Sequence, residues 1–189
     1  WVRETLGFEG LMNYQLQVDV HALDGADNSI FVYGVNPPRI LFGDGGVDDA
    51  EDAQVIIHEL THAFLNETSI NSNHGAERNA IDEGSADYLA SSYSKSLGDY
   101  SWNKVPSWDG HNEFWDGRIT NSTKTYPEYV ENNKCQDGEI WSSVLMEIEN
   151  ELGREVTTKL LLESSFNYFS KYIDMICLFF AKIESQHLY

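Results

Sequence analysis

His58-Glu59-Leu60-Thr61-His62 lies in the middle of an apolar run that extends from Val55 to Leu65. If this run is helical, the two histidines are four residues apart and project from one face, one turn above the other. Two imidazoles placed in this way can fill two positions of a tetrahedral zinc site. The pattern H-E-x-x-H is typical of zinc-dependent hydrolysis, with Glu59 as the general base that acts on a water at the metal.

Two histidines could also merely decorate a buried helix, so the interpretation needs a third ligand. A second helical run, residues 79–89, offers Glu83, and Asp87 lies four residues further on the same face. We expect Glu83 to bind the zinc and Asp87 to accept a hydrogen bond from the free ring N–H of His58. The alternative is a solvated acidic face, which is common in a chain with 31 acidic residues. The two motifs together favour the zinc site.

Read with three further blocks, these motifs resemble the gluzincin peptidases of the thermolysin and fungalysin kind, and most closely the bacterial fungalysin-like secreted metallopeptidases. The blocks are residues 25–29, 40–53 and 137–142, which occur in order around the two helical runs. The resemblance implies an α+β zincin fold of the thermolysin-like kind. Its parts would be a small N-terminal sheet with an edge strand, a central zinc helix and a helical C-terminal lobe, all in one catalytic domain over residues 1–189.

By this resemblance the chain is expected to be a zinc-dependent endopeptidase of protein or peptide substrates, with Zn²⁺ held by His58, His62 and Glu83. Asn28 occupies the position where thermolysin-like enzymes hold the substrate backbone with an asparagine side chain, although an isolated asparagine is more often a turn residue. The strand at 29–33 is expected to be an exposed edge along which an extended peptide can bind.

The rival hypothesis is a zinc-retaining domain with weak or no activity that binds peptides or serves a structural role. Fungalysin-like sequences usually carry an oxyanion-donating histidine where this chain has Cys135, and a thiol is a poor donor. The resemblance therefore implies a slow peptidase for its class, unless His111 or Tyr126 supplies the donor. Alternatively, Cys135 forms a disulfide with Cys177 and lies away from the zinc.

Calcium is a second cofactor to consider. Asp48 is the expected N-cap of the zinc helix, Glu51 completes a capping-box-like pair, and Asp49 and Asp52 suit the positive end of the helix dipole. The same acids could bind calcium, but capping already explains them. Thermolysin-like enzymes also use an acid one turn before the first zinc histidine for calcium, and that position is Gln54 here.

Composition narrows the class of partner. The formal net charge is −19, from 31 acidic and 12 basic residues, which argues against nucleic acid or an anionic membrane as partner. The chain has no apolar run of ~20 residues that could cross a membrane. It begins at Trp1 without a methionine, so we expect a mature fragment of a longer, secreted extracellular precursor, with an N-terminal pro-segment among its partners.

The remaining pattern predicts the order of elements. We expect the end of a helix in residues 1–13, a half-buried strand at 14–22, strands at 29–33 and 39–42, and a long aromatic-rich segment at 99–138. Helices are expected at 76–95, 139–152, 156–166 and 173–183.

Overall fold

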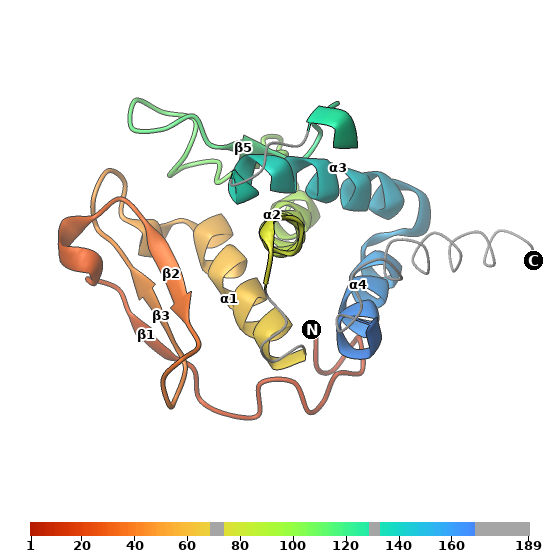
Figure 1. The fold of residues 1–189 in the computed structure, drawn as a ribbon, viewed down its shortest axis with the longest axis horizontal. Helices are drawn as coiled ribbons and strands as arrows, with labels where there is room; N and C mark the ends of the chain where they lie inside the picture. Colours follow the sequence, from red (N-terminus) through yellow and green to blue (C-terminus); the bar gives the residue numbers. More distant parts are fainter. Residues whose placement is uncertain (69–73, 129–132, 169–189) are drawn as a thin grey trace, which may run out of the picture.

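The computed structural model of the chain describes residues 1–68, 74–128 and 133–168. Within these ranges the fold is mixed α+β, and a small sheet and a group of helices lie on opposite sides of α1 (Figure 1). The strands are β1 (Gln17–Asp19), β2 (Ser29–Val32), β3 (Arg39–Phe42), β4 (Lys104–Val105) and β5 (Arg118–Ile119). The α-helices are α1 (Ala53–Thr68), α2 (Ala76–Ser96), α3 (Lys134–Leu152) and α4 (Arg154–Tyr168).

The main sheet has the order β1-β3-β2, with β1 parallel and β2 antiparallel to β3. β2 therefore forms one edge of the described sheet, as predicted. Ile40 and Phe42 of β3 pack with Val55 of α1 in a small core. β1 lies on the far side of β3, and its three residues are exposed. The predicted half-buried strand at 14–22 is thus shorter than expected and wrong in its burial.

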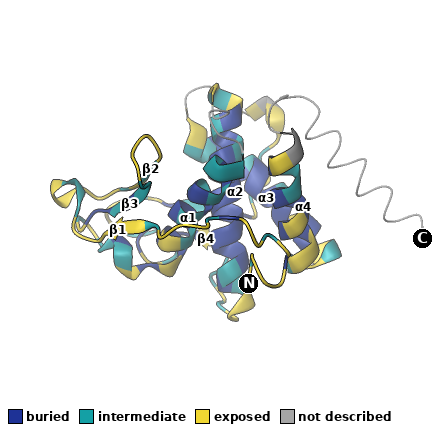
Figure 2. Cartoon of the chain, turned by 90° about the horizontal axis from the view of Figure 1, so that it is seen from below, coloured by how far each residue is buried: buried dark blue, intermediate teal, exposed yellow. Residues whose placement is uncertain are grey.

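The larger core lies among the four helices. It contains one buried residue of α1, two of α2, four of α3 and two of α4: Leu65, Tyr88, Leu89, Trp141, Leu145, Met146, Ile148, Leu160 and Leu161. Figure 2 shows α2 and α3 coloured as buried along much of their length, whereas the sheet is mostly intermediate or exposed. The stability of the fold therefore rests mainly on the helical group, and α1 links it to the sheet.

α2 is buried although much of its sequence is polar. Small side chains along the helix, among them Ser85, Ala86, Ala90, Ser91 and Ser92, are buried and leave room for neighbouring helices to approach closely. We expected the zinc helix to be the central buried helix. α1 does lie between the sheet and α2, but α2 is the helix enclosed by α1 on one side and α3 on another (Figure 1).

A polar network fixes α2 to the C-terminal helices. Tyr88 donates to Glu149 Oε2 at 3.0 Å and lies 3.2 Å from Thr158 Oγ1, and Ser92 donates to the same carboxylate oxygen at 2.5 Å. Burial and Glu149 raise the pKa of the Tyr88 phenol, so it remains a neutral donor. A buried carboxylate with several donors orients the helices without leaving an unpartnered charge.

Two predictions are wrong: that residues 1–13 are the end of a helix, and that Asp48 is the N-cap of α1. Residues 1–13 form turns, because Gly7 takes a positive φ of 84° that ends any helix, and Leu6 and Leu11 are buried there. Asp48 caps the short 3₁₀ helix Asp49–Glu51 by accepting from Ala50 N at 3.1 Å. The start of α1 uses the next acid instead.

That acid is Asp52. Its Oδ1 accepts from Gln54 N in the first turn of α1 at 2.7 Å, and its Oδ2 accepts from Trp108 N and Asp109 N at 3.1 and 3.0 Å. One side chain therefore caps the helix and holds the loop between β4 and β5 against it.

The remaining boundaries agree closely with the sequence, with one exception. α2 and α4 fall where helices were predicted, but α3 begins at Lys134, five residues before the predicted Glu139. Cys135 and Asp137 are therefore helical residues of the first turn. The predicted helix at 173–183 and Cys177 lie outside the described residues. Among the helices of the described part of the chain, none has the length and apolarity needed to cross a membrane.

The close approach of α2 and α3 generates a stability prediction. A Cβ on Gly84 would collide with the carbonyl oxygen of Gly138 and lie 3.0 Å from Trp141 Cβ. We expect Gly84→Ala to lower the free energy of unfolding by about 1–3 kcal/mol, because the two backbones must move apart. Urea denaturation measures this change through the transition midpoint.

Gly34→Ala is the matched control, because Gly34 is exposed and an added Cβ meets nothing within 4 Å. It should change the free energy of unfolding by no more than about 0.5 kcal/mol. Equal effects of the two substitutions would contradict the close packing of α2 on α3.

Candidate metal centre

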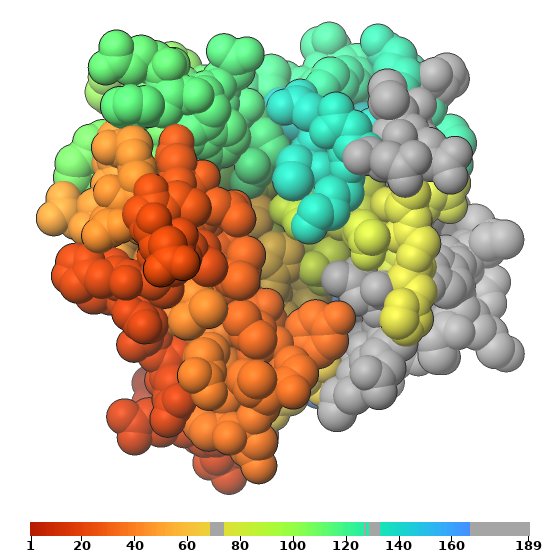
Figure 3. All heavy atoms as spheres, turned by 60° about the vertical axis from the view of Figure 1, so that its left-hand side comes forward, coloured from red at the N-terminus to blue at the C-terminus, as the bar shows by residue number. Residues whose placement is uncertain are grey.

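A cleft of about 760 Å³ runs between the edge strand β2, the helices α1 and α2, and the loop that joins β4 to β5. Figure 3 shows it as a hollow between the orange atoms of the sheet and the yellow and cyan atoms of α2 and the start of α3. The lining includes His58, Glu59, His62 and Glu83 from the predicted site, together with Asn28 at the start of β2.

Three side chains converge at the floor of this cleft. His58 Nε2 lies 3.1 Å from His62 Nε2 and 3.4 Å from Glu83 Oε2. The histidines come from adjacent turns of α1 and the glutamate from α2, as the helical spacing predicts. One potential ligand atom of each residue lies within 4.8 Å of the others, so the three can hold a metal ion.

The outer nitrogens of both imidazoles contact buried carboxylates. His58 Nδ1 lies 2.9 Å from Asp87 Oδ1, and His62 Nδ1 lies 2.7 Å from Asp82 Oδ2. Ionised carboxylates only accept hydrogen bonds, so each Nδ1 carries a proton and donates. A neutral imidazole with its proton on Nδ1 presents Nε2 as an acceptor. The two Nε2 atoms and Glu83 Oε2 are therefore three acceptors facing one another, an arrangement that requires a cation or a proton between them.

The pKa values of His58 and Glu83 also indicate that the site favours a positive charge. Burial lowers the pKa of His58, but hydrogen bonds to Asp87 and Glu83 outweigh burial and raise it to about 10. Burial raises the pKa of Glu83, yet the hydrogen bond from His58 and the neighbouring positive charges lower it well below its usual range. The site thus strongly favours positive charge beside a carboxylate that stays ionised.

Asp87 is held from its other side by Arg118. The guanidinium Nε lies 2.6 Å from Asp87 Oδ2, and a terminal nitrogen lies 2.7 Å from Oδ1. β5 carries Arg118 and pairs it with Val105 of β4, so the two-stranded sheet positions this contact. The predicted role of Asp87 as the partner of His58 agrees with this geometry, and the bidentate arginine fixes its orientation.

Asp82 was missed by the sequence analysis. It belongs to α2, one residue before Glu83, and it also lies 3.4 Å from Arg78 one turn earlier. Its signal in the sequence was only a second acid beside a ligand. His58 contacts Asp87, whereas His62, one turn later in α1, contacts Asp82, which lies earlier in α2. This pairing depends on how the two helices pack against each other. Helical periodicity within a single helix does not contain that information.

Glu59 is buried beside the first histidine, with 5 % of its surface exposed. Among the residues that the structure describes, none forms a hydrogen bond with its Oε2, although Glu59 lines the cleft. Leaving a buried carboxylate oxygen without a donor is unfavourable for folding, so such an atom points to a functional role. A carboxylate in this position can accept a proton from a water or a ligand in the cleft.

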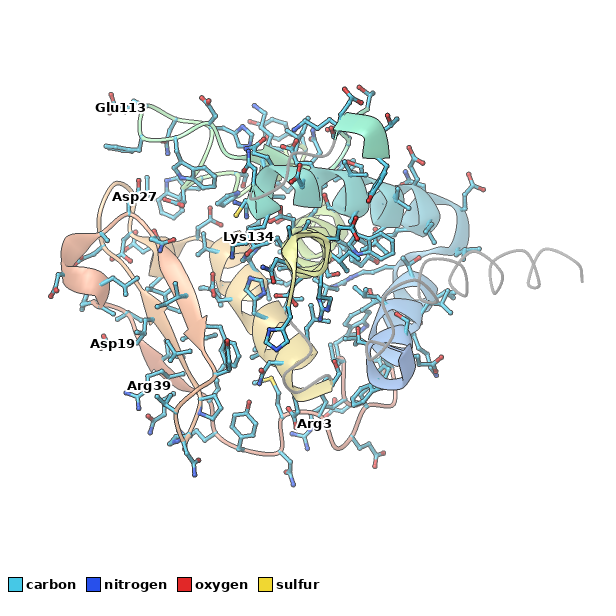
Figure 4. All side chains as sticks on the ribbon, in the orientation of Figure 1. Arg3, Asp19, Asp27, Arg39, Glu113 and Lys134 are labelled. Atoms are coloured by element: carbon cyan, nitrogen blue, oxygen red, sulfur yellow. The ribbon has the colours of Figure 1, made fainter. Side chains whose placement is uncertain are left out.

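The first turn of α3 reaches the same site. Lys134 Nζ lies 2.5 Å from Glu83 Oε1, and Cys135 Sγ lies 3.6 Å from Oε2. Figure 4 shows Lys134 close to α2, the helix that carries Glu83. The alternative that Cys135 lies away from the centre is therefore wrong, while its predicted pairing with Cys177 concerns a residue outside the described ranges. Burial first, and then Glu83, raise the pKa of the Cys135 thiol to about 11, which keeps it neutral.

The two alternative donors are not brought to the cleft. The His111 ring contacts the carbonyl oxygen of Arg118 at 2.8 Å, and the Tyr126 hydroxyl donates to Glu77. Neither residue lines the cleft, so the expectation that one of them replaces the missing histidine is not supported. His74, at the start of α2, does line the cleft and was not anticipated.

Gln54 stands where thermolysin-like enzymes have a calcium-binding acid, and the structure gives this glutamine another role. Its Oε1 accepts from Ser107 N at 2.6 Å. Where the resemblance implies an acid and calcium, this chain therefore ties α1 to the β4–β5 loop through a direct hydrogen bond. No protein-family model, curated protein or solved structure matches this chain.

The buried pair of Asp87 and Arg118 leads to a prediction. Asp87 is 0 % exposed, so Arg118→Leu would leave its carboxylate charge buried beside a single histidine donor. We expect the free energy of unfolding to fall by about 3–5 kcal/mol, the range for a buried pair that loses one member. Chemical denaturation at pH 7 measures this loss.

Arg3→Leu serves as the control, because Arg3 is exposed and its side chain donates only to a backbone carbonyl, that of Glu9. Adding Asp87→Asn to Arg118→Leu should recover part of the loss, since the uncompensated charge is then removed. Strict additivity of the two changes would contradict a direct interaction.

Proposed function

We propose that this protein is a zinc-dependent endopeptidase of the gluzincin kind, in which His58, His62 and Glu83 hold the metal. The observation that carries the proposal is the convergence of three acceptors on one buried point at the floor of a cleft. Two imidazoles and a carboxylate with an open side are the donor set of catalytic zinc sites. Glu59, next to this point and without a partner for one oxygen, supplies the base that such a site needs.

Two of the three ligand separations support zinc as the ion. Ligands at about 2.0–2.1 Å from a tetrahedral zinc are about 3.3–3.4 Å apart. The two Nε2 atoms are 3.1 Å apart, and His58 Nε2 is 3.4 Å from Glu83 Oε2. Both values are close to this ligand–ligand separation. Lys134 occupies the other oxygen of Glu83, which leaves a single oxygen to face the histidines.

The contacts outside this ligand set also support the proposal. Asp82 and Asp87 each bind the Nδ1 of one histidine, which fixes the tautomer that leaves both Nε2 atoms free for a metal. The neutral thiol of Cys135 lies near Glu83 but is a weaker ligand than a thiolate, so nitrogen and oxygen ligands are favoured.

A bound zinc ion supplies a Lewis acid that polarises a carbonyl group and increases the acidity of water. Glu59 then takes a proton from the attacking water and delivers it to the leaving amine of the cleaved peptide bond. The free edge of β2 lines the cleft, so an extended peptide can add to it as a further strand. Asn28, exposed at the start of this strand, is placed to hold the peptide backbone.

The finer features of the proposal follow from the same resemblance. They are the thermolysin-like zincin fold, secretion to the extracellular medium and a pro-segment that precedes the catalytic domain. An acidic chain with a sheet, a metal-binding helix and a helical group is compatible with each of them.

The proposed mechanism is tested by Glu59→Gln. The amide is nearly the same size as the carboxylate, so the fold and zinc content should be retained while peptide hydrolysis falls by about 10²–10⁴. His58→Ala should instead reduce zinc content to near zero. Zinc is measured by mass spectrometry and hydrolysis with casein and quenched peptides.

His21→Ala is the control for nonspecific metal binding, because His21 is exposed and lies on the sheet side of the molecule. It should change neither zinc content nor rate. Full zinc occupancy in His58→Ala would contradict the ligand assignment. A zinc-loaded wild type without hydrolysis of any peptide would instead favour a peptide-binding or structural domain.

A separate prediction concerns Asp82. Replacing it with alanine removes the acceptor that orients His62, so zinc affinity should fall by roughly 10–100-fold. Titration against a competing chelator gives this value. Glu77→Ala, an exposed acid on the same helix, is the matched control and should leave the affinity unchanged. Equal affinities for the two variants would mean that Asp82 does not act on the metal site.

A further inference from the structure

Three aspartates from separate segments converge in the wall of the same cleft. Asp27 precedes the edge strand β2, Asp49 precedes α1, and Asp109 belongs to the loop between β4 and β5. One carboxylate oxygen of each lies within 4.8 Å of the others. Figure 4 shows Asp27 at the end of the sheet that lies nearest the loop carrying Glu113. None of the three belongs to the zinc site.

Two of these carboxylates are buried and incompletely partnered. Asp49 is 2 % and Asp109 is 5 % exposed, and the Oδ1 atom of each has no hydrogen-bond partner within the described part of the chain. Ser29 donates to the other oxygen of Asp49, and the nearby Trp115 indole N–H lowers the pKa of the Asp109 carboxyl. Each buried acid therefore keeps one oxygen without a donor, beside two further carboxyls.

Such a cluster is unfavourable unless a cation or protons neutralise it. Burial first, and then Asp27, Glu59 and Asp48, raise the pKa of Asp49 to about 6, although the Ser29 hydroxyl lowers it. Burial, Asp49, Asp27 and Asp52 raise the pKa of Asp109 to about 7, against the effect of Trp115. Neighbouring acids therefore raise the pKa of both groups.

We propose that Asp27, Asp49 and Asp109 form a binding site for a calcium ion. All three ligands are hard carboxylate oxygens, which suit Ca²⁺ rather than the nitrogen-rich set around His58. Oxygens at about 2.3–2.6 Å from one ion can lie up to about 5 Å apart, so the spacing of the cluster fits. Asp27 is exposed, which leaves one side of the site open for waters to complete the coordination.

This site differs from the calcium position that the sequence analysis considered. Asp48 caps a 3₁₀ turn, Asp52 caps α1 and holds the loop, and Gln54 bonds directly to Ser107 N. Only Asp49 of that acidic run joins the cluster, and its two partners come from segments 22 and 60 residues away, as their numbers show.

The segments that the ion joins all border the cleft. Asp27 adjoins Asn28, which precedes β2, and Ser29 of that strand donates to Asp49. Asp109 lies near Trp115, which lines the cleft. The ion therefore ties the edge strand and the aromatic loop to the start of α1. The role of the ion is to stabilise the walls of the cleft. This role does not depend on whether the protein hydrolyses peptides.

The test uses the zinc-loaded protein with Tb³⁺ as a luminescent substitute for Ca²⁺. Trp115 contacts the Asp109 carboxyl, so excitation of tryptophan should sensitise Tb³⁺ emission, and added Ca²⁺ should displace it. Asp49→Asn and Asp109→Asn should each weaken Tb³⁺ binding by at least about tenfold, because fewer charged ligands remain. Asp116→Asn, an exposed acid of the same loop, is the matched control and should bind as the wild type does.

Thermal melting gives a second readout. Ca²⁺ at about 100-fold above its Kd should raise the Tm of the wild type by about 5–10 °C, and of Asp109→Asn by far less. Equal Tb³⁺ affinity and equal Tm shifts in wild type and both cluster variants would overturn the proposal. So would Tb³⁺ release by a lysine-rich peptide and not by Ca²⁺, which would make the cluster a substrate subsite. Neither readout depends on hydrolysis, and zinc content of the same samples reports separately on the His58 site.

Discussion

The mutual approach of three acceptor atoms, His58 Nε2, His62 Nε2 and Glu83 Oε2, is the constraint on which the rest of the structure depends. Without a positive charge between them these atoms repel one another. The fold must therefore hold α1 and α2 in close contact against that repulsion. The small side chains of α2 and the contact of Gly84 with Gly138 on α3 make such close packing possible. A bound metal ion would convert the same contact from a source of strain into a source of stability.

The charged groups around these three atoms alternate in sign from the histidines outward. Each histidine has a carboxylate behind it, and each carboxylate has an arginine: Arg118 behind Asp87 and Arg78 behind Asp82. Buried charges are tolerated in proteins when every member is paired. The β4–β5 ribbon, which is too short to contribute much to the core, is explained by its role in carrying Arg118 to this series. The aromatic segment between α2 and α3 thus helps to support the candidate metal centre.

Periodicity within each helix was sufficient to place His58 with His62 on one face of α1, and Glu83 with Asp87 on one face of α2, because each pair is spaced by one turn. A different local pattern predicted the strand β2: a short run of apolar residues bounded by turn residues. Asp82, Arg118 and Lys134 depend on how separate elements cross, and no local pattern encodes that. The Asp27, Asp49 and Asp109 cluster was missed for the same reason. Asp48 was misassigned as the helix cap because a 3₁₀ turn and the first turn of an α-helix both begin with a capping acid.

The most direct test of the account is X-ray absorption at the zinc K-edge on the purified protein. The proposal predicts one zinc with nitrogen and oxygen ligands at about 2.0–2.1 Å, including the multiple-scattering signature of two imidazoles. A sulfur ligand at about 2.3 Å would place Cys135 on the metal in place of Glu83 or a water. The absence of zinc after loading, or a zinc without imidazole ligands, would contradict the central claim that His58, His62 and Glu83 form a metal centre.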